Sequence, residues 1–472
     1  MNNTKIMERR EKILNDDIVK TLLTLAWPVM LGNTLHTAYN LADTFWLGKV
    51  GKEAVAASAT SWPIIFLFIS IGMGLSTAGV SLVSQYIGSN DHRKANKAAG
   101  QVLGLIFIIS VITAVVGFFS SEWILRVVVG SPDEVLPLAT TYLQIITLSL
   151  PVVFSFISFR FILRGIGDMI TPMYILGTGV VLNAILDPLL IMGYGPFPAM
   201  GVAGAALATA ITRIIASALG FYLLFSKKLD IILKLKDFKP EINWVKKIIN
   251  ISGPATIARA GSALGFVAMI TLVSKFGTVA VSAYGIGSKV IQLVNITTWG
   301  FAGSTLTMVG QNIGAGNKER AEVIVKKSML VAFVIMFIIA ILVYFTRADI
   351  VSVFINNPNV VFEGSRFLAI FVFAIPFFGV FRILDSTYRG TGHTKSAMVL
   401  SLSRLWILRV GLSYLLAFSV MGIGFKLGIV GIWWGMAIGN VIASGVSYIW
   451  FSIGKWKKKT IDEEDEQNVA LK

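Results

Sequence analysis

The chain has 472 residues, of which 55% are hydrophobic and 14% are charged, and its formal net charge at pH 7 is +16. In soluble domains about a quarter of all residues are charged, so this composition excludes an ordinary soluble protein and indicates a polytopic membrane protein. Cysteine is absent, which excludes disulfides and thiolate chemistry.

The N-terminal segment, residues 1–17, is charged and lacks an apolar core, so we expect no cleavable signal peptide there. Beyond it, many apolar stretches reach the roughly 20 residues that cross a bilayer as a helix. Alternating β-barrel segments are absent, so helices must satisfy the backbone. The twelve predicted spans are residues 20–46, 53–85, 97–119, 138–163, 170–192, 200–226, 246–275, 279–311, 325–345, 363–388, 394–420 and 428–453.

Lysine and arginine gather at the N-terminus, in the loops after even-numbered spans and after the last span. Such a distribution predicts that both termini are cytoplasmic in a multi-pass protein of the cell membrane. The same distribution indicates that the basic residues contact membrane lipids, which accounts for the positive net charge. We therefore expect no nucleic-acid partner. Residues 456–472 are expected to form a charged cytoplasmic tail.

The second half of the chain repeats the first at a nearly constant offset. The matched pairs are Pro28 with Pro254, Gln85 with Gln311, Arg164 with Arg389, and Gly201 with Gly428. An offset that holds along the whole chain indicates a duplication.

Each half has six spans, an even number, so both copies enter the membrane from the same side and form parallel repeats. We predict an all-α membrane protein with an N-lobe at 1–225, a cytoplasmic linker at 226–247 and a C-lobe at 248–455. Two equivalent bundles can enclose a cleft that opens alternately to either side, which favours a transporter.

Carboxylates inside an apolar chain are costly and are by default candidates for a proton or cation site. In the first span, His36, Tyr39 or Asn40, and Asp43 recur at helical spacing and predict one polar stripe. Asp43 would lie about one turn inside the outer surface. The alternative is an ordinary helix-end residue that touches water.

In the fifth span, Asn183 and Asp187 are four residues apart and share one helix face. Asp43 and Asp187 at similar depth could share a proton or ligate Na⁺ through oxygen, with Asn183 and Thr209 as further ligands. Thr209 in the sixth span could instead bond its own backbone.

Pro28 in the first span removes a backbone hydrogen bond and favours a kink. That kink could respond to the charge of Asp43, or it could be static. The third intramembrane acid, Asp385, lies beside Arg382 and Arg389, which predicts a structural ion pair. Further basic residues within spans are Arg213, Arg259, Lys289, Arg404 and Arg409.

No phosphate-binding loop, nucleophile elbow or metal-ligand spacing of histidines is present, so we expect neither an enzyme nor a bound cofactor.

Residues 39–48 of the first span, the loop 88–95 with its copy 314–321, and Arg164-Gly-Ile-Gly-Asp168 together resemble the multidrug and toxic compound extrusion (MATE) family, most closely its prokaryotic DinF-like branch. The resemblance implies two six-helix lobes in a V shape and export of cationic or amphipathic compounds in exchange for H⁺ or Na⁺. In that branch the cation site and the first-span proline would fall here on Asp43, Asp187 and Pro28. The seventh span has no acid, so coupling in the C-lobe, as in the NorM-like branch, is not expected.

A cation-coupled exporter of drug-like molecules, acting as a monomer, is therefore the first hypothesis. The second is a flippase for lipid-linked oligosaccharides or lipids of the same superfamily, whose basic residues within spans would face an anionic head group. A membrane-embedded enzyme or receptor is a third possibility, which no catalytic motif supports.

Overall fold

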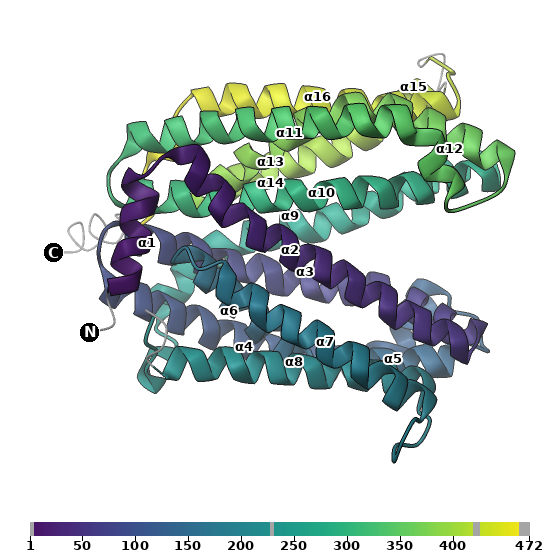
Figure 1. Ribbon diagram of the computed structural model, residues 1–472, viewed down its shortest axis with the longest axis horizontal. Coiled ribbons are helices and arrows are strands. Elements are labelled where there is room, and N and C mark those ends of the chain that lie inside the picture. Colours follow the sequence, from purple (N-terminus) through teal and green to yellow (C-terminus); the bar gives the residue numbers. More distant parts are fainter. Residues whose placement is uncertain (1–3, 227–230, 419–424, 462–472) are drawn as a thin grey trace. The chain divides into compact units, whose positions relative to one another are not determined.

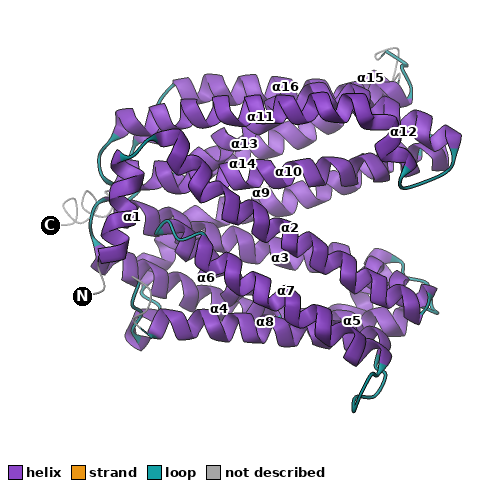
Figure 2. Ribbon diagram, in the orientation of Figure 1, coloured by secondary structure: helices purple, strands orange, loops and turns teal. Residues whose placement is uncertain are grey.

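A computed structural model describes residues 4–226, 231–418 and 425–461 of the chain. Within these ranges the protein is helical and contains no strand (Figures 1 and 2). Eleven helical segments of the described chain are long and apolar enough to cross a membrane, and a bent helix pair raises the number to twelve. The all-α fold with twelve spans that the sequence predicts is confirmed.

The first repeat begins with a short amphipathic helix, and its six spans follow in chain order. Its helices are α1 (Thr4–Asn15), α2 (Ile18–Val50), α3 (Lys52–Gly88), α4 (His92–Trp123), α5 (Leu136–Leu148), α6 (Leu150–Gly165), α7 (Ile170–Met192) and α8 (Gly201–Phe225). A π-helical turn at Ile124–Val129 extends α4, and a 3-10 turn at Leu235–Phe238 lies between the repeats.

The second repeat has the same order of spans. Its helices are α9 (Ile242–Ser274), α10 (Gly277–Gly314), α11 (Lys318–Ser352), α12 (Pro358–Phe371), α13 (Ile375–Gly390), α14 (Thr394–Leu402), α15 (Leu412–Ala417) and α16 (Ile429–Ser452). A π-helical segment at Ser403–Gly411 joins α14 to α15. The predicted eleventh span ends at 420, so its last two residues lie outside the described ranges.

The fourth and tenth spans are each interrupted just before a proline. Helices α5 and α6 meet at an angle of 51° next to Pro151, and a 3-10 turn at Val372–Ala374 separates α12 from α13 next to Pro376. Proline lacks the amide that a continuous helix needs, so it favours a break at these positions. The two prolines match in the sequence repeat, and the duplication is thus visible in the structure.

The helices gather into two compact units. The N-terminal unit comprises the residues up to Glu11 and Trp27–Thr256, and the C-terminal unit comprises Lys12–Ala26 and the residues from Ile257 onward. The division falls within α2 next to Pro28 and within α9 next to Pro254.

Each unit has its own apolar core. In the N-terminal unit, Ala57, Ile65 and Leu143 are buried between α3 and α5. In the C-terminal unit, Tyr284 stacks on Trp433 with ring centroids 6.2 Å apart, and Phe367 lies 4.5 Å from the same indole. Side-chain packing of this kind holds the helices together in lipid, where the hydrophobic effect does not drive their association.

Glycine allows a close helix contact in the N-terminal unit. A Cβ atom at Gly204 on α8 would lie 2.3 Å from the carbonyl oxygen of Leu190 on α7. No side chain fits at that distance, so the residue brings the two backbones together, as small residues do in membrane helices.

The N-terminal helix α1 and the start of α2 are held by side chain to backbone bonds. Arg10 donates to the carbonyl oxygen of Gly88 at the end of α3, at 2.9 Å. The Asp17 carboxylate accepts the amide of Lys20 at 2.8 Å and thereby caps α2. That bond holds the pKa of the Asp17 carboxyl below its usual range.

Candidate functional site

The N-terminal unit brings together the two carboxylates that the sequence singles out. Asn183 and Asp187 are fully buried on α7, and the Asn183 amide donates to the Asp187 carboxylate at 2.9 Å, as their spacing predicts. Asp43 on α2 is half-buried, and its carboxylate is close enough to Asp187 for the two to interact electrostatically. Two like charges in a poorly hydrated place repel each other, so the pair favours binding of a cation.

Three oxygen atoms of this group are buried and lack a hydrogen-bond partner among the described residues. They are Oδ1 of Asp43, Oδ1 of Asn183 and Oδ2 of Asp187. Buried acceptors without a donor are costly. A proton on one carboxylate would supply a donor, and a sodium ion would use the oxygens as ligands. No group of three or more acidic or histidine side chains in the described ranges is arranged to hold a metal ion.

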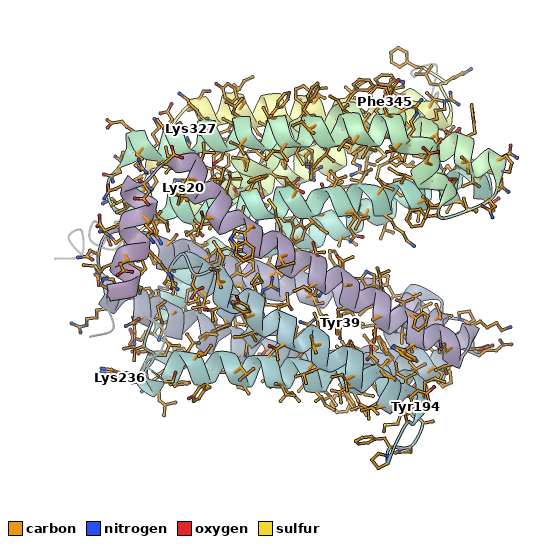
Figure 3. The ribbon with its side chains drawn as sticks, viewed as in Figure 1. Lys20, Tyr39, Tyr194, Lys236, Lys327 and Phe345 are labelled. Atoms are coloured by element: carbon orange, nitrogen blue, oxygen red, sulfur yellow. The ribbon has the colours of Figure 1, made fainter. Side chains whose placement is uncertain are left out.

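Tyr39 and Thr209 join α2 to α8 beside the carboxylates. The Tyr39 hydroxyl is hydrogen-bonded to the Thr209 hydroxyl, so the side chain of Thr209 reaches across to another helix. Tyr39 is buried within the N-terminal unit (Figure 3). The structure adds Tyr142 on α5, a buried residue that interacts electrostatically with both Asp43 and Asp187. Nothing in its sequence context separates Tyr142 from an ordinary core aromatic.

Asn40 lies against His36 on the same helix. Its amide lies 3.4 Å from Nδ1 of His36, and Nε2 of the same imidazole lies 3.4 Å from a guanidinium nitrogen of Arg213. The Arg213 guanidinium in turn stands over the Tyr39 ring, 5.4 Å from its centroid. Tyr39 therefore lies between the carboxylates of Asp43 and Asp187 and the basic side chains of His36 and Arg213.

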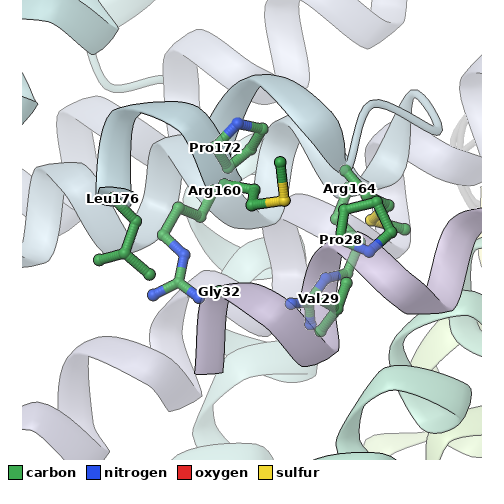
Figure 4. A pocket seen from close by; sticks show the side chains of 9 residues that line it. Pro28, Val29, Gly32, Arg160, Arg164, Pro172 and Leu176 are labelled. Carbon is green, nitrogen blue, oxygen red and sulfur yellow. The ribbon is translucent and has the colours of Figure 1, made fainter. Parts of the chain in front are cut away.

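Pro28 lies on the wall of a small cavity rather than beside Asp43. Helix α2 remains helical through Pro28, so a bend there that depends on charge stays a prediction. Figure 4 shows the cavity, with the guanidinium of Arg160 extending toward Gly32. The residues that line it are Pro28, Val29, Gly32, Arg160, Arg164, Met169, Pro172, Met173 and Leu176.

In the C-terminal unit the intramembrane carboxylate lies in an ion pair with two arginines. Asp385 accepts from Arg389 at 2.9 and 3.1 Å and from Arg382 at 3.3 Å, which confirms the predicted ion pair. Arg404 donates to the amide oxygen of Asn440 at 3.0 Å.

The positions that match the N-lobe carboxylates carry no acid in the second repeat. In the alignment that pairs Gln85 with Gln311, Asp43 corresponds to Met269 and Asp187 to Ser413. The two units are therefore alike in fold and different in chemistry.

Comparison with known proteins shows that this chain is similar to membrane transporters. The MatE family matches residues 28–189 and 254–415. The probable multidrug resistance protein YpnP of Bacillus subtilis is 28% identical over 93% of this chain and 96% of its own length. An FAD transporter of Shewanella oneidensis is 28% identical over 87% of this chain and 90% of its own. A crystal structure of a MATE protein in complex with MaL6 shares the fold, with a TM-score of 0.87 at 24% identity, covering 94% of this chain and 98% of that one.

Proposed function

Because this chain belongs to the MatE family of membrane transporters, we propose that it is a secondary active exporter of small cationic or amphipathic molecules, driven by exchange for H⁺ or Na⁺. The observation that carries the proposal is the pair Asp43 and Asp187 with the neighbouring Asn183, each of which has one buried oxygen that lacks a donor among the described residues. Relatives named as multidrug resistance proteins support the class of substrate.

Coupling would arise from competition between the ion and the substrate. A proton on Asp43 removes a buried charge, so α2 no longer needs water at that position and can repack toward α7. Repacking about Pro28 would narrow the substrate path in the N-lobe and release the substrate. An ion can drive this change only to the extent that it binds one conformation better than the other.

The orientation in the membrane is part of the proposal. We place both termini and the linker 226–247 in the cytoplasm, between an N-lobe at 1–225 and a C-lobe at 248–455. The distribution of basic residues supports this orientation. Lys236 and Tyr194 lie at opposite ends of the N-terminal helix bundle (Figure 3), as the proposal requires of the linker and the loop after α7.

The test is substrate efflux from proteoliposomes under separately imposed pH and sodium gradients. Asp43→Asn and Asp187→Asn should each abolish gradient-driven efflux while the protein still folds, because an amide does not exchange a proton and ligates sodium weakly. Asp133→Asn, the same substitution at an exposed position of this unit, is the matched control and should transport normally. Efflux that keeps its gradient dependence in both N-lobe variants would refute the assignment of the site.

A second candidate is a flippase or carrier for molecules with an anionic group. Two observations favour it: the basic residues that line cavities in the N-terminal unit and the relative named as an FAD transporter, since FAD carries phosphate. In the C-terminal unit Arg404 is bonded to Asn440 and Lys289 is exposed, so these residues add little support.

A further inference from the structure

One exposed helix face of the C-terminal unit has the composition that lipid requires. Every exposed side chain of α11 between Leu330 and Phe345 is apolar, and Ile338, near the middle of the helix, is 51% exposed. Apolar side chains insert favourably into the core of a bilayer. The face of α11 is therefore a reference for a surface of this unit that contacts lipid.

Helix α10 has an exposed face of another kind. Lys289 and Gln292 are exposed on it, and Ser288 and Asn295 are half-buried at neighbouring positions. None of the four side chains has a hydrogen bond or an ion pair with a residue that the structure describes. Charged side chains in membrane spans face the interior of a bundle or water rather than hydrocarbon. Since Lys289 is exposed, this face of α10 contacts water.

Lys289 lies too deep in α10 for its ammonium group to reach the membrane surface. At a rise of about 1.5 Å per residue, it is about 18 Å from Gly277, the nearer end of the helix. Lysine side chains extend to the interface only from positions near a helix end. Water must therefore reach Lys289 inside the span.

The matched helix of the first repeat indicates that the fold does not need this charge. At the offset that aligns α3 with α10, Lys289 corresponds to Pro63. The exposed side chains beside Pro63 are Trp62 and Phe66, whose ring centroids lie 6.4 Å apart. The matched face is aromatic and uncharged within the same architecture, so packing alone does not account for Lys289.

We propose that the exposed face of α10 lines the aqueous path of the substrate and that Lys289 gives this path its charge selectivity. The selected class is amphipathic molecules with one positive charge, in preference to dications. A fixed ammonium group in the wall repels every cationic centre at its depth. A monocation can place its apolar end near Lys289 and its charge away from it, whereas a molecule with a charge at each end cannot.

The inference rests on the proposed export function for its substrate, but the water-filled path and its charge can be tested without any substrate. The chain lacks cysteine, so a single-cysteine variant reports on one position. Gln292→Cys, one turn from Lys289, should react with polar methanethiosulfonate reagents in proteoliposomes. Ile338→Cys, on the lipid face of α11, is the control and should not react, because a thiol in hydrocarbon does not ionise.

The charge is measured with two reagents of similar length, one bearing a trimethylammonium group and the other a sulfonate. In Gln292→Cys, adding Lys289→Gln should raise the ratio of the cationic to the anionic reaction rate at least about fivefold. That is the effect on two opposite charges of losing one unit charge about 7 Å away in water. Lys289→Arg keeps the charge and should keep the ratio. Lys318→Gln, at an exposed lysine of the same unit, is the matched control and should leave the ratio unchanged.

Efflux from proteoliposomes then tests the selectivity. Hexyltrimethylammonium is compared with hexamethonium, which has the same six-carbon chain and a second trimethylammonium group. Lys289→Gln should raise hexamethonium efflux relative to hexyltrimethylammonium efflux at least about threefold.

An unreactive Gln292→Cys variant, or a reagent ratio that does not change when Lys289 is replaced, would overturn the assignment of α10. Efflux with the same preference in the wild type and in Lys289→Gln would overturn the charge selectivity. If neither compound is exported under any gradient, the proposed function and the selectivity both fail, while the reagent rates still decide whether α10 lines a water-filled path.

Discussion

The Asp385 carboxylate neutralises two arginines within the C-terminal unit, so its removal is a direct test of how this unit is stabilised. Its side chain is 1% exposed and accepts from Arg389 and Arg382. The Ser401 hydroxyl donates a further hydrogen bond at 3.0 Å. With its charge gone, the two guanidinium groups would remain in a poorly hydrated place with no counter-ion from this position.

Asp385→Asn should therefore destabilise the protein by about 3 kcal/mol, the lower end of what loss of one partner costs a buried ion pair. The lower end applies because the amide keeps one acceptor oxygen. Ser401→Ala, which removes one hydrogen bond to a charged group, should cost about 1.5 kcal/mol. Gradient-driven export should persist in both variants, since the proposed coupling site lies in the other unit.

Reversible unfolding in mixed micelles gives the free energies, and efflux from proteoliposomes gives the ion dependence. Glu122→Gln at the exposed pair with Arg126 is the control, expected to change stability by less than about 0.5 kcal/mol. Joint replacement of Asp385 and Arg389 by leucine should recover part of the loss. This account would be refuted if the Asp385→Asn variant were as stable as the wild type. It would also be refuted if efflux by this variant no longer depended on the imposed ion gradient.

Substrate affinity in detergent, measured across about pH 5 to 8, should fall toward acid pH, and it should fall with added sodium at fixed pH if sodium is the coupling ion, because linkage is reciprocal. Pro28→Ala should reduce this ion dependence more than it reduces substrate binding itself. Substrate affinity independent of both ions would contradict the mechanism. Gly204→Ala should lower the free energy of unfolding by at least about 2 kcal/mol because its Cβ meets a carbonyl oxygen, whereas Gly445→Ala, with open space around it, should not; equal values would contradict the packing. In this chain without cysteine, Lys236→Cys and Tyr194→Cys should react with an impermeant thiol reagent from opposite faces of the membrane, and labelling from one face would contradict the topology.

The order of the spans could be predicted because hydropathy and length determine which segments enter a bilayer. The predicted seventh span, 246–275, corresponds to α9 at Ile242–Ser274, and the eighth, 279–311, to α10 at Gly277–Gly314. Differences at the ends arise because helices continue past the apolar stretch. The break between α5 and α6 was not predicted, although Pro151 stands beside it.

The candidate site could be predicted where it lies on one helix and not where it depends on contacts between helices. The pair Asn183 and Asp187 follows from spacing alone. The Tyr39 to Thr209 bond and the position of Tyr142 depend on how α2, α5 and α8 pack. Arg160 was missed as well, although its match to Asp385 in the sequence repeat was a usable signal.

The membrane class, the duplication and the candidate carboxylates can be predicted from the sequence, because each is a property of composition or of a pattern along the chain. Which charges are neutralised and which face a cavity follows from the tertiary packing. Asp385 and Arg160 occupy matching positions in the two repeats, and both are charged residues in apolar spans. Whether such a charge is balanced depends on side chains that approach it from other helices. Those distances are set by the packing of the whole unit, which no local pattern in the sequence encodes.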